Sequence, residues 1–260
     1  MGTRRWFVPI AFLLTATAWL ALVLWEQSPY GRYLDHGRWT EMGIAAAICR
    51  AVPAGGVIVP MLLYAGGWLL MIAAMMLPTS LPLFGLFHRM VRDRPERAEL
   101  VTALVLGYLL AWGGFAAAAH LLDTLLHEAA RQIGWLAANG WTLGAAVLTA
   151  AGLFQFSRLK YRCLDKCRTP YSFLAHHWRG PAPRRDALRL GLHHGLFCVG
   201  CCWAIMLLMF VVGTGNVGWM LVLGAIMALE KNLPWGRRLS RPLGLVLLLW
   251  AAAVTAINIA

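Results

Sequence analysis

The sequence predicts an all-α protein, a polytopic bundle of about seven transmembrane helices with its N-terminus in the cytoplasm. Of the 260 residues, 60% are apolar and only 13% are charged, whereas a soluble domain of this size needs more charge to cover its surface. Apolar runs close to the roughly 20 residues that a bilayer core requires recur along the chain. Basic residues gather in alternate connections between these runs. We therefore expect one transmembrane domain over residues 1–260.

Seven apolar runs are the candidate spans, and they cover residues 6–25, 57–78, 100–122, 141–157, 191–212, 216–230 and 242–259. The first is expected to be a retained anchor helix, because the small residues that resemble a cleavage site lie inside its apolar run. Pro78 and Pro82 interrupt the second run, since each removes a backbone donor from the helix. The piece 79–87 is therefore expected to be a separate half-turn or a re-entrant segment.

The distribution of Lys and Arg predicts the orientation. If the N-terminus lies in the cytoplasm and the spans alternate in direction, only four of the 23 basic residues lie on the outer side. These four are Arg32, Arg38, Arg50 and Arg131. Because basic residues favour cytoplasmic loops, we expect an N-in, C-out protein of the bacterial inner membrane. The net charge of +12 reflects this bias, and the expected partner is the lipid bilayer, with no nucleic acid.

The cysteines are unevenly placed along the chain. Cys49 is alone in an outer loop, near a short amphipathic stretch at 39–50, and is expected to be a buried or free thiol. The other five of the six cysteines fall on the predicted cytoplasmic side, in "CLDKC" and "HHGLFCVGCCW": Cys163, Cys167, Cys198, Cys201 and Cys202. A reducing compartment disfavours structural disulfides, which leaves metal binding or redox chemistry as the main uses.

The spacing of the second cluster can be tested on a helical wheel. His194 falls with Cys198, Cys201 and Cys202 on one arc of roughly 100°. In "CLDKC" the i, i+4 spacing points both sulfurs the same way. If the two clusters share an ion bound at about 2.3 Å from each sulfur, one sulfur of each should lie within roughly 4 Å of the other.

The residues around "CLDKC" are basic. Positive charge beside a thiol lowers its pKa and favours the thiolate, the form that binds metal. We therefore expect Arg162 and Lys166 to lower the pKa of the neighbouring thiols, although the same residues also suit a solvated cytoplasmic face.

The donor types indicate which metal would bind. Thiolates and thioethers suit Cu(I), whereas cysteine with histidine also suits zinc. Methionines in "WLLMIAAMMLP" favour copper as the first choice and zinc as the second, although a methionine stripe is also common in hydrophobic cores. The predicted ligand set is Cys163, Cys167, Cys198, Cys201, Cys202, His194, Met75 and Met76. Glu230 and Lys231 end the sixth span, and a structural role and a role in the site are equally compatible with them.

Several of these stretches resemble the domain-of-unknown-function 2182 family. They are "LKYRCLDKCRTP" from Leu159, "GLHHGLFCVGCCWAIM" from Gly191, "WM" at Trp219 and "EK" at Glu230. "WLLMIAAMMLPTSLPL" from Trp68 is similar to the first conserved block of that family. The resemblance covers residues 65–235 and implies an integral membrane protein that binds a metal. At Gly215 the chain lacks a methionine that the family pattern often has.

Three functions agree with these observations. The first is a membrane-embedded metal-binding protein that handles copper and delivers it, possibly to a membrane enzyme, with a metal chaperone as a further partner. The second is a membrane thiol–disulfide oxidoreductase that uses the pair Cys198 and Cys201. The third is an accessory subunit of a larger membrane complex, since Gly and Ala in the spans suit helix packing. The chain has no phosphate loop and no Ser-His-Asp pattern, so an enzyme is less favoured.

Overall fold

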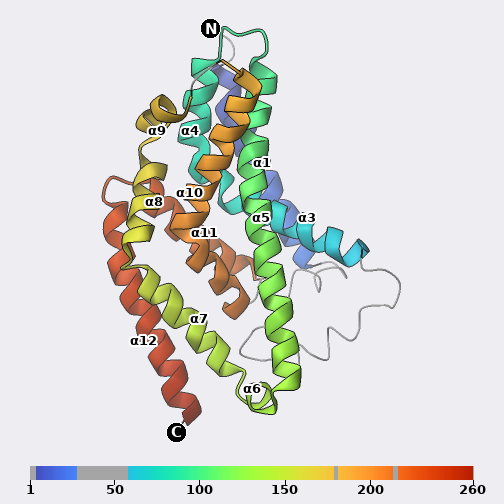
Figure 1. Ribbon diagram of the computed structural model, residues 1–260, viewed down its shortest axis with the longest axis vertical. Coiled ribbons are helices and arrows are strands. Elements are labelled where there is room, and N and C mark those ends of the chain that lie inside the picture. Colours follow the sequence, from blue (N-terminus) through green and yellow to red (C-terminus); the bar gives the residue numbers. More distant parts are fainter. Residues whose placement is uncertain (1–3, 28–57, 179–180, 213–215, 260) are drawn as a thin grey trace.

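The computed structural model describes residues 4–27, 58–178, 181–212 and 216–259, and within these ranges the chain is helical with no strand (Figure 1). The predicted all-α class is confirmed. In chain order the elements are α1 (Arg4–Glu26), α3 (Ile58–Met75), α4 (Leu77–Met90), α5 (Arg97–Gln132), α6 (Gly134–Ala138), α7 (Trp141–Phe154), α8 (Arg158–Arg168), α9 (Pro170–His177), α10 (Pro183–Val212), α11 (Val217–Asn232), the 3-10 helix η3 (Gly236–Leu239) and α12 (Ser240–Ile259). Each of the seven predicted apolar runs coincides for most of its length with one of these helices.

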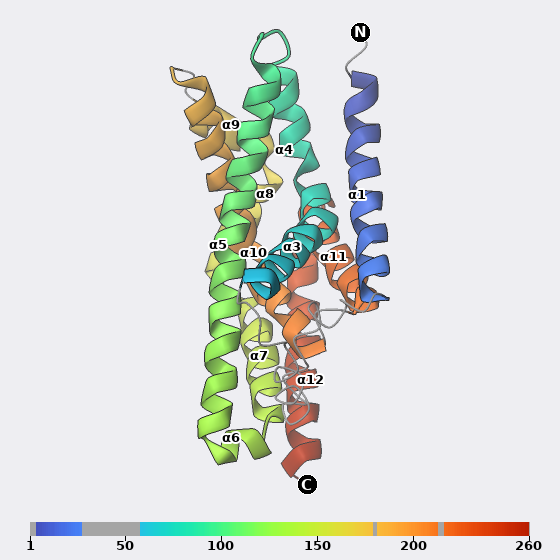
Figure 2. The ribbon, with the colours of Figure 1, turned by 90° about the vertical axis from the view of Figure 1, so that its right-hand side faces the viewer.

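The centre of the bundle is α10, which packs on α5, α7, α8, α9 and α11. Its contact with α5 is the most extensive, and the two helices run side by side along much of their length (Figures 1 and 2). A second long pair is formed by α7 and α12. Figure 2 shows α1 at the edge of the bundle, beside α3 and α4. The buried faces of α10 are therefore covered by helices from both halves of the chain.

Glycines allow the close approach of α5 and α10. A Cβ atom built on Gly191 would overlap the carbonyl of Leu104, and one built on Gly107 would overlap the carbonyl of Leu188. At Gly195 a Cβ atom would lie 2.6 Å from the Cβ of Ala111. Backbones that touch in this way gain packing contacts that larger residues would prevent.

The break between α3 and α4 lies at Met76, and the two helices are bent by 69°. The expected half-turn at 79–87 is wrong, because α4 is a helix of 14 residues that passes through Pro82. The alternative expectation, a re-entrant segment, stays a prediction. Pro78 lies in the first turn of α4, where the missing N–H has no intrahelical partner to lose. The proline therefore starts a new helix, and Met76 occupies the corner.

The predicted inner loop 158–190 is also largely helical. It forms α8, α9 and the first turns of α10. The side chain of Ser157 caps α8 by accepting from the backbone N–H of Lys160 at 3.1 Å, which is the usual role of serine at a helix start. The predicted amphipathic stretch at 39–50, Cys49 and Gly215 lie outside the described residues.

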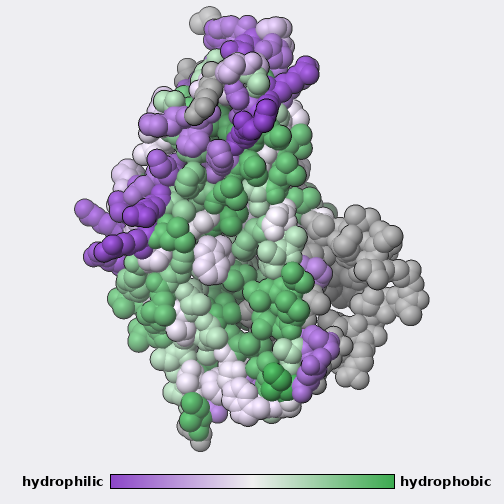
Figure 3. Space-filling view, viewed as in Figure 1, coloured by the Kyte–Doolittle hydropathy of each residue, from purple (hydrophilic) through white to green (hydrophobic). Residues whose placement is uncertain are grey.

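Among the described residues, three helical segments are long and apolar enough to cross a membrane, namely Arg97–Leu122, Pro183–Val212 and Gly236–Ile259. A fourth is added if Gly66–Met75 and Leu77–Met90 form one bent span. Figure 3 shows apolar side chains over the middle of the molecule and hydrophilic ones gathered at the end that holds the α4–α5 connection. These features agree with a membrane protein, while the count of seven spans and the N-in orientation stay predictions.

Replacing Gly191 by alanine tests the α5–α10 crossing. The added methyl group would overlap the α5 backbone, so we expect Gly191→Ala to lower the free energy of unfolding by about 1 to 3 kcal/mol. Thermal unfolding of the purified protein in detergent measures the effect. Gly114→Ala is the matched control, because a Cβ there meets nothing within 4 Å and alanine favours a helix over glycine. Equal stability of the two variants would contradict the close crossing.

Candidate metal centre

Three of the predicted ligands come from one buried face of α10. Cys198, Cys201 and Cys202 are each no more than 1% exposed. The thiols of Cys201 and Cys202 donate to the carbonyl of Cys198 at 3.1 and 2.8 Å. Bonds of this kind to the preceding turn orient a side chain along the helix. The predicted common face of these cysteines is therefore present, and it points into the bundle.

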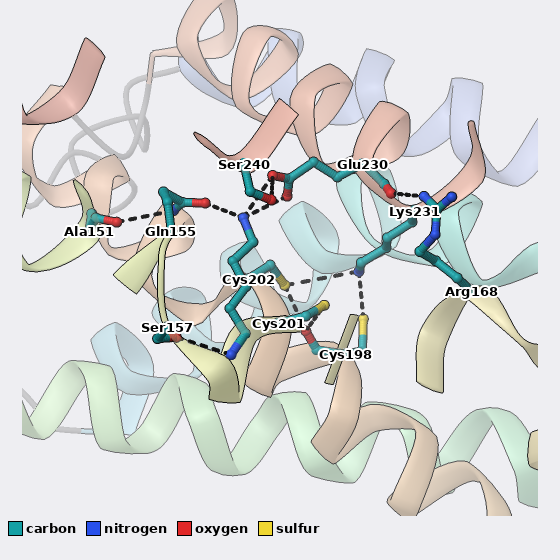
Figure 4. A network of polar contacts seen from close by, with 11 residues as sticks. Ala151, Gln155, Ser157, Arg168, Cys198, Cys201, Cys202, Glu230, Lys231 and Ser240 are labelled. Carbon is teal, nitrogen blue, oxygen red and sulfur yellow. Dashed lines mark hydrogen bonds and ion pairs between the residues drawn. The ribbon is translucent and has the colours of Figure 1, made fainter. Parts of the chain in front are cut away.

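Lys231 from α11 reaches into this cluster of sulfurs (Figure 4). Its ammonium donates to the sulfur of Cys198 at 2.9 Å and lies 4.0 Å from the sulfur of Cys202. It also lies 3.4 Å from the hydroxyl oxygen of Thr79. The residue is only 6% exposed, so its charge faces sulfur rather than water.

Met76 brings a thioether to the same place. Its sulfur is 3.8 Å from that of Cys202 and 3.8 Å from the ammonium of Lys231. The bend at the start of α4 leaves the Met76 carbonyl open, and it accepts from the hydroxyls of Thr79 at 2.8 Å and Tyr108 at 3.2 Å. The Tyr108 hydroxyl also lies 3.3 Å from the sulfur of Cys198. These bonds fix the corner that carries the thioether.

The "CLDKC" cluster approaches from α8. The sulfurs of Cys167 and Cys201 are 4.0 Å apart, so the expected approach of the two clusters is confirmed at this pair. Cys163 packs on Gly200, where an added Cβ atom would lie 2.7 Å from its sulfur. All five described cysteines are free thiols, and Cys167 is the least buried of them.

The pKa values of the two α8 thiols differ from expectation. Burial, with the charge of Cys201, raises the pKa of Cys163. Hydrogen bonding with Cys198 and Cys201, together with burial, raises the pKa of Cys167 well above its usual value. Both pKa values are thus raised overall, and Arg162 and Lys166 are not among the causes, so their expected effect on these thiols stays a prediction. Both thiols hold their protons at neutral pH, and a metal that binds them must displace those protons.

Two further predicted ligands, His194 and Met75, make their described contacts with groups other than the sulfurs. The Nε2 atom of His194 pairs with the hydroxyl of Ser80 at 3.2 Å, and its ring stacks on Tyr108 with the centroids 5.8 Å apart. The Nδ1 atom of this buried imidazole has no hydrogen-bond partner. Met75 packs on α11, with its Cγ 3.5 Å from the position of a Cβ on Gly224. Of the predicted ligands that are not cysteines, Met76 contacts a thiol, with its sulfur 3.8 Å from that of Cys202, and the roles of Met75 and His194 as ligands stay predictions.

A buried ion pair attaches α8 to α11. The ammonium of Lys160, which is 0% exposed, contacts both carboxylate oxygens of Glu230 at 2.7 and 2.9 Å. Glu230 also accepts from Ser240 at 2.8 Å, and Gln155 accepts from Lys160 (Figure 4). Arg168 donates to the carbonyls of Glu230 and Pro234 from the other end of α8. Both ends of the helix that carries Cys163 and Cys167 are therefore fixed.

Sequence reasoning did not find this pair or the role of Tyr108. For Glu230 and Lys231 the sequence left a structural role and a role in the site open, and the available signal was two opposite charges beside an apolar run. The chain has three lysines, at positions 160, 166 and 231, and two of them, Lys160 and Lys231, are buried. Nothing in the local sequence marks Tyr108, because its position depends on the packing of α5 on α10.

The donor set can be compared with that of a metal site. In the described ranges no group of three His, Cys, Asp or Glu side chains is arranged to hold a metal ion. A group made of His, Cys, Asp and Glu does not include methionine. The third soft donor near Cys198 and Cys202 is the thioether of Met76. Free thiols with a thioether in a dry interior suit Cu(I) better than zinc, which favours thiolates and imidazoles. The residues therefore fit copper as cargo, while their assignment as ligands stays a prediction.

An all-helical bundle with thiols and a thioether gathered in its interior defines a class of protein able to handle a soft cation. The family model that matches this chain, over residues 65–254, is PpoB2, described as copper chaperone. The chain belongs to this copper chaperone family, and every sulfur of the candidate metal centre lies within the matched region. No curated protein and no solved structure matches the chain. The resemblance to the domain-of-unknown-function 2182 family stays a prediction under that name.

Removing one partner of the buried ion pair tests how α8 is held. Lys160→Leu leaves the Glu230 carboxylate buried without its ammonium, so we expect a loss of about 3 to 5 kcal/mol in the free energy of unfolding. The double variant Lys160→Leu with Glu230→Leu should lose less, since two apolar side chains replace the pair. Chemical denaturation in detergent measures both. A double variant less stable than the single one would contradict the pairing.

Proposed function

We propose that this protein is a membrane-embedded copper chaperone whose cargo is Cu(I). The observation that carries the proposal is the 4.0 Å approach of Cys167 on α8 to Cys201 on α10, beside a second contact of 3.8 Å between Cys202 and Met76. Sulfurs that bind one Cu(I) ion, or exchange it, need to be neighbours of this kind. Membership of a copper chaperone family supports the same cargo.

The two clusters suit two successive positions of the ion. Cys167 is partly exposed, whereas Cys198, Cys201 and Cys202 are buried. Copper would first contact Cys167 and Cys163, then pass to the α10 thiols and Met76 by exchange of one sulfur for another. The oxidation state does not change, and each thiol that becomes a ligand releases its proton. His194 and Met75 border this path and are secondary candidates.

Copper analysis of the purified protein tests this function. Protein loaded with Cu(I) without oxygen should hold at least one copper per chain, whereas the variant Cys198→Ser, Cys201→Ser and Cys202→Ser should lose it. X-ray absorption should give sulfur neighbours at about 2.3 Å. Cys49→Ser is the matched control and should keep its copper. Zinc in place of copper would favour the second choice of metal, and wild-type protein without either metal would contradict the proposal.

The same analysis separates the proposal from disulfide chemistry. Cys167 and Cys201 are free thiols that could also pair with each other. If thiol trapping in cells finds a reversible disulfide at this pair and purified wild-type protein binds no copper, the oxidoreductase function is favoured instead.

We also propose an N-in, C-out arrangement in a bacterial inner membrane, in which α8 and α9 face the cytoplasm. The bias of basic residues toward one side of the chain supports it, as does the hydrophilic end of the molecule (Figure 3). A reporter fused at Ala260 should be active if it is of a kind that works only on the outer side of the membrane. Activity of a cytoplasmic reporter at this position would overturn the arrangement.

The receiver of the copper is a membrane protein in this proposal. Exposed apolar side chains on α12, such as Leu245 and Leu249, would face lipid or a membrane enzyme that accepts the ion. An accessory role in a larger complex is compatible with this function. Purification in mild detergent distinguishes the cases, because a subunit of a stable complex should co-purify in a fixed ratio with its partners.

A further inference from the structure

The charge of Lys231 faces sulfur atoms and not a carboxylate. Its ammonium contacts Cys198 at 2.9 Å, Met76 at 3.8 Å and Cys202 at 4.0 Å. Its sequence neighbour Glu230 points away and is already paired with Lys160 and Ser240 (Figure 4). Within the described ranges no salt bridge joins Lys231 to Asp or Glu. The two adjacent residues therefore serve two different buried clusters.

A buried ammonium is costly unless groups around it compensate its charge. Here the compensating groups are the same soft sulfurs that would bind a cation. The ammonium carries one positive charge, as Cu(I) does, and a lysine side chain is long and flexible enough to withdraw. Cu(I) can thus take the position of the ammonium between these sulfurs with the same single positive charge.

We propose that Lys231 sets the charge selectivity of the sulfur cluster, by occupying in the unloaded protein the position that Cu(I) takes and by disfavouring divalent ions. After withdrawal the ammonium stays attached to the end of α11, close to the bound ion. Its repulsion is proportional to the charge of that ion, so zinc is penalised twice as strongly as Cu(I). This inference rests on the proposed function, since it concerns the same cargo.

The exchange is balanced in charge and electrons. Cu(I) leaves a thiolate carrier and bonds to the sulfurs of Cys198, Cys202 and Met76. Any thiol that becomes a ligand gives its proton to the carrier thiolate or to water, and the ammonium breaks its hydrogen bond to Cys198. No group is oxidised or reduced. Lys231 is thus a selectivity residue, and it need not coordinate the metal.

The ratio of metal affinities tests the role of this charge. Cu(I) and zinc affinities are measured by competition with chromophoric chelators, in detergent and without oxygen. In Lys231→Leu the preference for Cu(I) over zinc should fall by at least about tenfold, while Lys231→Arg should retain it. Lys166→Leu is the matched control, because Lys166 is an exposed lysine of α8, and its ratio should equal that of the wild type. An unchanged ratio in Lys231→Leu, with both metals bound, overturns the inference alone.

A measurement on the wild type decides the matter if Lys231→Leu does not fold. The side-chain nitrogens of the three lysines can be isotopically labelled and followed by NMR during titration with Cu(I). One bound equivalent should shift the Lys231 signal and leave that of Lys166 in place. A Lys231 signal that stays unmoved while copper binds overturns the inference. Wild-type protein that binds no copper overturns the proposed function and this inference together.

Discussion

The buried ion pair between Lys160 and Glu230 determines where the two thiol clusters meet. It joins the first turn of α8 to the last turn of α11, and both charged groups lie out of water. Because an unpaired charge is very unfavourable in such an interior, neither helix can move away from the other at low cost. The contact of Cys167 with Cys201 is supported by this attachment, since α8 has only two buried residues besides Lys160, namely Cys163 and Leu164.

The end of α11 connects this attachment to the sulfur cluster. Glu230 holds α8, while Lys231, the next residue, faces Cys198. The helical turn places these two side chains on different faces, so one short segment serves both a structural pair and the candidate metal centre. A displacement of α11 would therefore change the position of α8 and the surroundings of Cys198 at the same time. The proposed withdrawal of Lys231 leaves the ion pair intact, because only the lysine side chain has to move.

Much of the fold could be predicted from the sequence, because apolar runs and cysteine spacing are local signals. Each of the seven runs coincides for most of its length with a helix. The three α10 thiols share one buried face. The choice between Met75 and Met76 could not be made in this way. It depends on the 69° bend, which places Met76 at the corner beside Cys202 while Met75 packs on Gly224.

Other features depend on contacts between distant segments. His194 lies on the predicted helical face, and its Nε2 atom shares a hydrogen bond with Ser80 from α4, a partner that the local sequence does not reveal. The surroundings of Lys231 could not be read from its helix end, because they are supplied by Met76 at the α3–α4 corner, by α4 and by α10. Burial of the α8 thiols, which raises their pKa values, likewise follows from packing and not from the basic residues next to them.

The ion pair also has a consequence for the order in which the chain is completed. Glu230 follows Lys160 by 70 residues, so during synthesis α8 and α10 are made before the carboxylate that Lys160 requires. Until α11 has been added, burial of Lys160 would leave its ammonium without a counter-charge. The thiols of α8 therefore reach their final position late in biosynthesis. A chain truncated before Glu230 would contain every cysteine of the candidate site and still lack the means to hold them together.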